Sequence, residues 1–408
     1  MSTGRQLAVL AAALAIVATS GSAALAQKKY DTGATDTEIK VGNIMPYSGP
    51  ASAYGVIGRT EAAYFKMIND QGGINGRKIN FISYDDNYSP PKTVEQARKL
   101  VESDEVLLVF NSLGTPPNTA IQKYMNQKKV PQLFVATGAT KWNDPQNFPW
   151  TMGWQPNYQS ETIIYARYIL KNHPNAKIAV LYQNDDYGKD YLKGLKDGLG
   201  AKAASMIVAE DSYEVSEPTI DSHIVRLKAT GADVFINITT PKFAAQAIKK
   251  NAELGWKPLH FLNNVSGSIG SVIKPAGFEN AQDIISSQYF KDPTDAQWKS
   301  DKAMIAWNEF LDKYYPEANR ADASVMYAYI VSQGLVHVLK ACGDNLTREN
   351  IIKQAASIRD YEPLGLLPGV KVNTSATDFA PLSQLQLIRF KGETWERFGE
   401  VLSGDVGG

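Results

Sequence analysis

The sequence contains one cysteine and four histidines, and its formal net charge at pH 7 is zero. A single cysteine cannot form an intramolecular disulfide, and it excludes CxxC metal and redox sites. The histidines lie far apart, and no pair has the i, i+4 spacing with which a helix binds zinc. The balanced charge gives no electrostatic reason to bind nucleic acid or an anionic lipid surface. We therefore expect no metal site and no nucleic-acid partner.

Motifs for nucleotide chemistry and for nucleophilic catalysis are also missing. There is no GxxxxGK[ST] phosphate loop, and no GxGxxG follows a predicted strand. Residues 266–270 read Ser-Gly-Ser-Ile-Gly, which lacks the first glycine of a GxSxG nucleophile elbow. The acid pairs Asp85-Asp86 and Asp185-Asp186 could bind a metal, but acids at strand ends more often cap the next helix. We predict no cofactor and no enzymatic activity, with an exported hydrolase as the alternative.

The N-terminal residues have the parts of a secretory signal. Arg5 precedes the twelve-residue apolar run Leu7–Ala18, and a small-residue stretch ends with Ala24-Leu25-Ala26, an A-x-A-like cleavage site. The run is shorter than the roughly 20 residues that span a bilayer, so an uncleaved anchor is the less favoured alternative. No cysteine lies near the cleavage point, which excludes a lipoprotein. We predict that residues 1–26 are removed and that the mature protein is periplasmic.

Beyond this segment, short apolar runs alternate with amphipathic stretches. Residues 106–110, Val-Leu-Leu-Val-Phe, show no polar alternation, as expected of a parallel strand with helices on both sheet faces. The 408 residues exceed what one hydrophobic core usually fills. The order predicts an α/β protein with two doubly wound sheets. The predicted strands are Ile39–Met45, Ile79–Tyr84, Val106–Phe110, Leu133–Ala136, Ile178–Tyr182, Val234–Ile238 and His260–Leu262.

The last third of the chain has a different pattern. Two long helical segments are predicted over residues 295–315 and 322–341, and Cys342 follows the apolar stripe of the second, so we expect it in the core. Lys391-Gly392 can turn a hairpin between two strand-like runs. Residues 152–158 and 285–292 are candidate crossovers between the two lobes. Without a low-complexity linker, we expect short hinges.

Ligands of open α/β sheets bind beyond the carboxyl ends of the strands, so the residues there form the candidate site. In the first lobe these loops are rich in hydroxyl and small residues, with Ser112, Thr115 and Thr140 near helix starts. Hydroxyls and free N–H groups at helix N-termini can bind an anion, although each residue alone could simply be a cap. In the second lobe, Tyr187 and Phe243 could cover the apolar body of a ligand.

The string Ile68–Lys78, which reads Ile-Asn-Asp-Gln-Gly-Gly-Ile-Asn-Gly-Arg-Lys, would end a helix and reverse into a strand through its glycines. It resembles the signature turn of the leucine/isoleucine/valine-binding type of periplasmic solute receptor. The loop Ser48–Gly55, the string Asp185–Gly188 and the helix end Ala252–Gly255 are similar to that family as well. The resemblance extends over about residues 36–400.

The resemblance implies a type I periplasmic binding protein with two Rossmann-like lobes and three hinge crossings. It would close on a small solute and deliver it to the permease subunits of an ABC importer. The first lobe is then expected over residues 36–155 and 286–378, and the second over residues 156–285 and 379–403. The ligand-binding residues that the resemblance implies are Tyr54, Ser112, Thr115, Thr137 and Ala139 of the first lobe and Tyr187 of the second. Thr239 and Asn264 join the candidate site because they follow strands of the second lobe. Because the sequence shows short connectors and no oligomerising apolar repeat, we expect a monomer.

The sequence departs from the amino-acid-binding members of the family at one informative place. They pair the ligand ammonium with an acid after the last strand of the second lobe, where this chain has Asn263, Asn264 and Ser266. They also usually carry two cysteines. We therefore predict a small carboxylate with an apolar or aromatic body as the ligand. A branched-chain or other hydrophobic amino acid, with Asp185 or Asp186 pairing the ammonium, is the alternative, as is an amide or urea.

Overall fold

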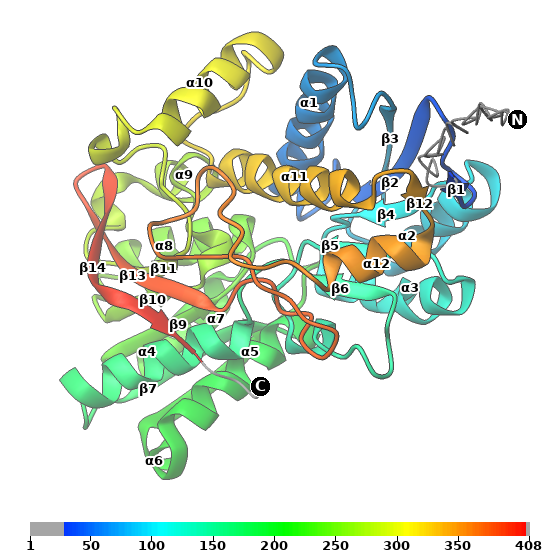
Figure 1. The fold of residues 1–408 in the computed structure, drawn as a ribbon. Helices are drawn as coiled ribbons and strands as arrows, with labels where there is room; N and C mark the ends of the chain where they lie inside the picture. Colours follow the sequence, from blue (N-terminus) through cyan, green and yellow to red (C-terminus); the bar gives the residue numbers. More distant parts are fainter. Residues whose placement is uncertain (1–27, 405–408) are drawn as a thin grey trace, which may run out of the picture.

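The computed structural model describes residues 28–404, so the predicted signal segment lies outside the described residues. Two α/β lobes lie side by side, one blue to cyan and the other green in Figure 1. The first contains a parallel five-stranded sheet, and the second a mixed seven-stranded sheet. The first sheet has the order β3-β2-β4-β5-β6, with β2 (Glu38–Met45), β3 (Lys78–Asp85), β4 (Leu108–Phe110), β5 (Gln132–Val135) and β6 (Thr151–Gly153).

The second sheet has the order β14-β13-β11-β10-β9-β7-β8. Its strands β7 to β11 are parallel, and the C-terminal hairpin β13–β14, red in Figure 1, is added antiparallel at one edge. The bounds are β7 (Ile178–Gln183), β8 (Ile207–Tyr213), β9 (Val234–Ile238), β10 (Leu259–Leu262), β11 (Ile285–Gln288), β13 (Gln384–Lys391) and β14 (Thr394–Ser403). A separate short pair joins β1 (Lys29–Tyr30) to β12 (Asn345–Leu346).

Helices cover both faces of each sheet, which is why a central strand such as β4 is continuously apolar. In β4, Leu108 and Phe110 pack into the cluster on one face, whereas Val109 packs with Ala97 and Ile121 on the other. The helices are α1 (Val56–Asp70), α2 (Pro90–Arg98), α3 (Thr115–Lys128), α4 (Tyr158–Asn172), α5 (Asp186–Leu199), α6 (Ala203–Met206), α7 (Asp221–Ala229), α8 (Pro241–Glu253), α9 (Lys274–Ala276), α10 (Lys302–Tyr314), α11 (Ala323–Cys342) and α12 (Arg348–Ala355).

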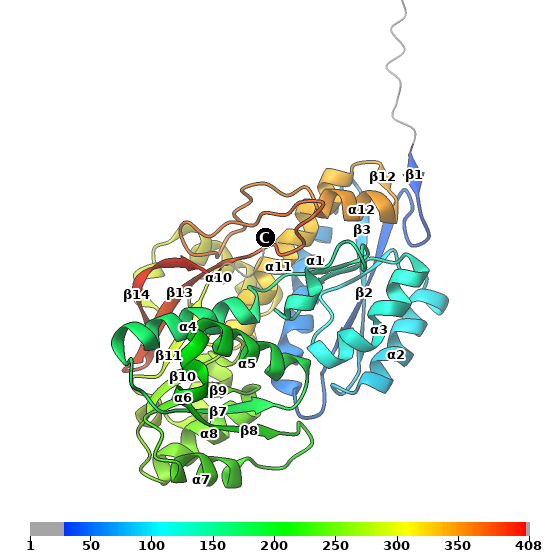
Figure 2. The same ribbon diagram turned by 90° about the horizontal axis from the view of Figure 1, so that it is seen from below.

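The chain passes between the lobes three times. It leaves the first sheet after β6, returns after β11 to form α10 to α12, and crosses again to form the hairpin β13–β14. Figure 2 shows the resulting interleaving, with the yellow-orange helix α11 packed on the blue helix α1. The boundary predicted between residues 285 and 286 falls inside β11, which pairs with β10 and β13 in the second sheet.

Helix α11 is the one helix of residues 28–404 whose length and apolar composition would suit a membrane span, yet 78% of its most apolar stretch is buried in the protein. It is therefore a core helix. Its last residue, Cys342, is buried as predicted. The other predicted helix of this region is shorter than expected, because the chain forms a single 3-10 turn at Ala296–Trp298 before α10 begins.

The glycine turn after α1 has the backbone geometry that its sequence predicts. Gly72, Gly73 and Gly76 all have positive φ, between 74° and 104°. A Cβ atom at Gly73 would lie 2.1 Å from the carbonyl oxygen of Arg77, so a side chain there would collide with the returning strand.

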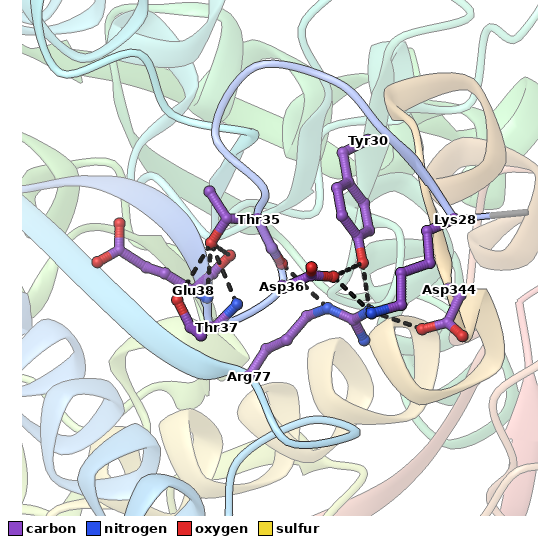
Figure 3. A network of polar contacts seen from close by, with 8 residues as sticks. All are labelled: Lys28, Tyr30, Thr35, Asp36, Thr37, Glu38, Arg77 and Asp344. Carbon is purple, nitrogen blue, oxygen red and sulfur yellow. Dashed lines mark hydrogen bonds and ion pairs between the residues drawn. The ribbon is translucent and has the colours of Figure 1, made fainter.

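Arg77, at the end of this turn, ties three separate segments together (Figure 3). Its side chain is 3% exposed. The guanidinium donates to the hydroxyl of Tyr30 and to Asp344, both at 2.6 Å, and to the carbonyl oxygen of Thr35 at 3.1 Å. The nearby ion pair between Lys28 and Asp36 is exposed to solvent. Arg77 therefore holds the β1–β12 pair against the first lobe.

We predict that Arg77→Ala lowers the free energy of unfolding by about 2–3 kcal/mol, because hydrogen bonds of a buried charged group are stronger than neutral ones. Lys28→Ala is the matched control, and it should leave stability unchanged because exposed ion pairs contribute little. Urea unfolding of both variants measures the difference. Equal midpoints for Arg77→Ala and Lys28→Ala would contradict the assignment.

Candidate ligand-binding site

Two neighbouring chambers lie between the lobes, with cavity volumes of about 30 and 40 Å³. We name them by one residue each: the Thr115 chamber, at the start of α3, and the Ser324 chamber, at the start of α11. Four residues line both chambers, namely Tyr54, Ile57, Gln155 and Val265. Among the described residues, no Asp, Glu, Lys, Arg or His side chain lines either chamber.

The first lobe contributes the start of α3 to the Thr115 chamber. Thr115 is followed by Pro116 and Pro117, which have no N–H group, so Thr115 alone keeps an amide hydrogen among the first three helix residues. Its hydroxyl lies 2.6 Å from that of Thr137, which also accepts from the indole N–H of Trp142 at 3.1 Å. The helix therefore offers fewer N–H donors than we expected of a helix start, and the threonine hydroxyls carry more of the polarity.

The structure brings together some of the predicted site residues and leaves others outside. Tyr54, Thr115 and Tyr187 line the Thr115 chamber, and Tyr54 and Asn264 line the Ser324 chamber. Thr137 lies behind Thr115, in hydrogen-bond contact with it.

The remaining predicted residues do not line the chambers. The hydroxyl of Thr239 donates to Asn237 at 2.7 Å, and the neighbouring Thr240 lines the Thr115 chamber instead. Ser112 is 2% exposed, and its hydroxyl has no partner among the described residues. Ala139 lines a separate surface pocket beside Lys141.

A hydrogen bond between the lobes lies where the two chambers adjoin. The hydroxyl of Tyr54, from the first lobe, donates to the carbonyl oxygen of Val265, from the second, at 2.9 Å. Tyr54 is 8% exposed, so water has little access to this contact. At the surface, Lys141 of the first lobe pairs with Asp186 of the second at 3.1 Å. The structure thus has the lobes closed over the chambers.

Tyr88 lines the Thr115 chamber, although sequence reasoning missed it. It follows β3, and both it and Asn87 have φ near +55°, an unusual backbone for residues with side chains. Its ring lies against Gly114, where a Cβ atom would come within 2.5 Å of it. The position of Tyr88 after a strand end was the available signal. Other lining residues that were missed are Gln155, Ser268, Tyr289, Ser324 and Tyr327.

The paired acids have local partners in the loops. Asp185 caps α5 by accepting from the N–H groups of Tyr187 at 3.0 Å and Gly188 at 3.2 Å. Burial raises the pKa of its carboxyl. Asp186 pairs with Lys141 on the surface, and its side chain is 57% exposed. The capping role predicted as the more frequent one is confirmed for Asp185, and neither acid lines a chamber.

A different acid, Glu161, lies one layer behind the site. It is 3% exposed, in the first turn of α4. One of its oxygens accepts from the backbone N–H of Asn264 and from the hydroxyl of Tyr165, both at 2.6 Å; the other accepts from the hydroxyl of Tyr191 at 2.7 Å. Burial raises the pKa of this carboxyl. Tyr191 in turn stacks on Tyr158, a lining residue of the Thr115 chamber, at 4.3 Å between centroids. Glu161 therefore supports the walls of both chambers.

The chain crosses three times between two α/β lobes, and the candidate site lies between them at the ends of their strands. This arrangement is the type I periplasmic binding fold. The profile of the family described as periplasmic binding protein matches residues 38–394. The chain belongs to this family, whose members are solute-binding receptors rather than enzymes. The predicted resemblance and the predicted fold class are thereby confirmed.

Proteins of similar sequence include two Leu/Ile/Val-binding protein homologs. The chain is 27% identical over 326 residues to the Leu/Ile/Val-binding protein homolog 1 of Brucella suis, covering 78% of this chain and 82% of that protein. It is 25% identical over 320 residues to homolog 2 of Brucella abortus, covering 77% and 81%. These matches span most of both proteins.

Solved structures share the architecture over nearly the whole chain. A branched chain amino acid ABC transporter protein from Thermus thermophilus, solved with bound valine, has a TM-score of 0.81 at 16% identity, covering 90% of this chain and 97% of that one. A fatty acid ABC transporter substrate-binding protein from Thermomonospora curvata has a TM-score of 0.76 at 20% identity, covering 92% and 95%. At such identities the likeness concerns the fold.

Proposed function

We propose that this protein is the extracytoplasmic receptor of an ABC importer and that it captures a small carboxylate with an apolar or aromatic body between its closing lobes. The observation that carries the ligand class is the uncharged lining of both chambers. The hydroxyl and N–H of Thr115 can donate to a carboxylate, and the rings of Tyr54, Tyr158 and Tyr187 can contact an apolar body.

The absence of acids from the lining argues against an α-amino acid. An ammonium enclosed in a closed cleft must be paired, or the free-energy cost of removing it from water is not compensated. Asp185 and Asp186 already have other partners, and Glu161 contacts Asn264 from behind rather than lining a chamber. A carboxylate differs, because neutral hydroxyl and N–H donors of the protein can stabilise it through charge-assisted hydrogen bonds.

The matched test compares ligands that differ only in the ammonium. We predict that 3-phenylpropanoate binds more tightly than L-phenylalanine, and 4-methylpentanoate more tightly than L-leucine, in isothermal titration calorimetry. Thr115→Val should weaken binding of the acids about tenfold or more, because a hydrogen bond to a charged group is lost. Thr377→Val, at an exposed position that lines neither chamber, is the control. Tight binding of a free amino acid, with none of the acids, would contradict the proposed ligand.

A hydrophobic amino acid is the second candidate. It is favoured by the likeness to Leu/Ile/Val-binding homologs and to a structure that contains valine. The same titrations decide between the two candidates, and urea and acetamide as added probes test the amide alternative. Thermal-shift screening with these compounds is a rapid first step, since a ligand that binds only the native state raises the melting temperature.

The transport role also implies a location and a motion. We infer a monomer in the periplasm, partnered by permease subunits, that closes by rigid-body rotation about the three crossings. The bond between Tyr54 and Val265 would then form only on closure. Small-angle scattering should show a smaller radius of gyration with saturating ligand than without it.

A further inference from the structure

We infer that the two chambers are subsites for one elongated ligand. Its carboxylate occupies the Thr115 chamber, its apolar body passes Tyr54, and its far end enters the Ser324 chamber with an uncharged hydrogen-bonding group of the hydroxyl type. This inference rests on the proposed function, because it takes the carboxylate to bind at Thr115. It adds the length of the ligand and the chemistry of its second end.

The first observation is that the chambers adjoin. Tyr54, Ile57, Gln155 and Val265 belong to the lining of both, so a ligand that reaches from one chamber to the other would pass these side chains. The hydroxyl of Tyr54 is already bonded to Val265, so the Tyr54 ring and Ile57 give this boundary its apolar surface. The amide oxygen of Gln155, beside them, accepts from the hydroxyl of Tyr158 at 3.5 Å. An apolar or aromatic segment of a ligand suits this boundary, because it has no polar groups that need hydrogen-bond partners when buried.

The second observation is that the Ser324 chamber has polar atoms without protein partners. The side-chain N–H₂ of Asn264 donates to the carbonyl oxygen of Ser287, which fixes the amide, while its Oδ1 accepts no hydrogen bond from a described residue. The hydroxyl of Tyr289 also makes no hydrogen bond within residues 28–404, although Tyr289 is only 1% exposed. Both residues line the chamber, so these two polar atoms can meet a bound ligand. A ligand hydroxyl can donate to Asn264 and accept from Tyr289.

The third observation orients the ligand. An anionic end in the Ser324 chamber would face the acceptor oxygen of Asn264, and behind that residue lies the carboxyl of Glu161, 2.6 Å from the Asn264 nitrogen. The Ser324 chamber also adjoins a helix start, that of α11, but there the carboxyl of Asp322 already accepts from the N–H of Ser324 and the hydroxyl of Ser268, both at 3.0 Å. The Thr115 chamber has the positive end of the 14-residue helix α3, with hydroxyls and one N–H and no capping carboxylate. The charged end therefore belongs at Thr115 and the uncharged polar end at Asn264.

The test is a double comparison of ligand and protein. Phenylacetate, 3-phenylpropanoate and 4-phenylbutanoate, each with and without a 4-hydroxyl on the ring, are titrated against the mature protein and against Asn264→Leu. In the unmodified protein the hydroxyl should tighten binding about threefold to tenfold at the chain length that reaches the Ser324 chamber. In Asn264→Leu, which has a similar volume but no acceptor, that gain should disappear.

Two further variants make the outcomes distinct. Tyr289→Phe removes only a hydroxyl, so it should reduce the same gain even if Asn264→Leu folds poorly. Thr115→Val should weaken the hydroxylated and plain acids equally. A hydroxyl gain that persists in both Asn264→Leu and Tyr289→Phe, or the lack of any gain in the unmodified protein, would overturn the inference of two subsites. A normal affinity of Thr115→Val for all the acids would instead overturn the proposed function.

Discussion

Glu161→Ala is expected to lower the free energy of unfolding by about 2–5 kcal/mol and to abolish measurable ligand binding. The carboxyl of Glu161 accepts three hydrogen bonds from three different segments. Without it, the N–H of Asn264 and the hydroxyl of Tyr191 lose the acceptor that the structure gives them, and each buried orphaned donor costs about 1–3 kcal/mol. Tyr165 is affected less, because it also donates to the carbonyl oxygen of Leu262 at 3.0 Å.

The binding loss should follow from the positions of the contacts rather than from unfolding. Asn264 lines the Ser324 chamber, and Tyr191 supports Tyr158 in the Thr115 chamber, so both walls lose a support at once. Glu161→Gln is the matched variant. Its carbonyl oxygen can keep both bonds on the side of Asn264 and Tyr165, and its amide can donate to the hydroxyl of Tyr191.

Calorimetric titration of the folded variants with 3-phenylpropanoate, together with their melting temperatures, separates the two effects. Glu161→Gln should bind within about threefold of the unmodified protein, corresponding to roughly 0.7 kcal/mol or less. If Glu161→Ala remains folded and binds normally, Glu161 does not position the site. A loss of binding in Glu161→Gln equal to that in Glu161→Ala would show that the charge of Glu161, rather than its hydrogen bonds, is what matters.

The parts of the fold that the sequence predicted are those with strong local signals. The run Val106–Phe110 is apolar at every position because its side chains enter clusters on both faces of the sheet. Strand β8 was missed because it lies at the sheet edge and alternates between exposed and half-buried residues, without a dominant apolar face. Strand β11, Ile-Ser-Ser-Gln, was assigned to a crossover because its buried positions are filled by polar residues.

Site residues could be predicted only where they come directly after a strand in the sequence. Thr115, Tyr187 and Asn264 were found this way, and the structure places each of them in a chamber wall. The role of Glu161 could not be found, since an acid in the first turn of a helix is already explained by the helix dipole. Its partners Tyr191 and Asn264 are 30 and 103 residues away. Such contacts depend on how the second lobe packs, which no local pattern records.

A second buried acid, Glu61 of α1, differs from Glu161 in having almost no partners. It is fully buried, its Oε2 accepts only from the amide of Asn43 at 3.3 Å, and its Oε1 has no partner among the described residues. No Lys, Arg or His forms an ion pair with it within residues 28–404. Burial therefore raises the pKa of Glu61 well above its usual range. Its carboxyl binds a proton more tightly in the folded protein than in the unfolded chain.

The sign of the pH dependence follows from this difference. As pH rises above the unfolded-state pKa of about 4.3, the unfolded chain loses its proton first, so the folded state loses stability relative to it until the folded-state pKa is passed. Glu61→Met removes this titration and leaves Asn43 bonded to the carbonyl oxygen of Phe110 at 3.0 Å. We therefore predict that Glu61→Met is more stable than the unmodified protein at pH 7 and that its advantage grows between pH 4 and pH 8.

Thermal unfolding at several pH values measures this advantage directly. Glu61→Gln serves as the control for the titration itself. It should show the same flatter pH dependence as Glu61→Met, at a lower stability, because its amide places an extra buried donor where Glu61 already lacks a partner. Parallel curves of stability against pH for the unmodified protein and Glu61→Met would mean that Glu61 titrates alike in the folded and unfolded states. In that case burial does not control its charge, and the first lobe must admit water at that position.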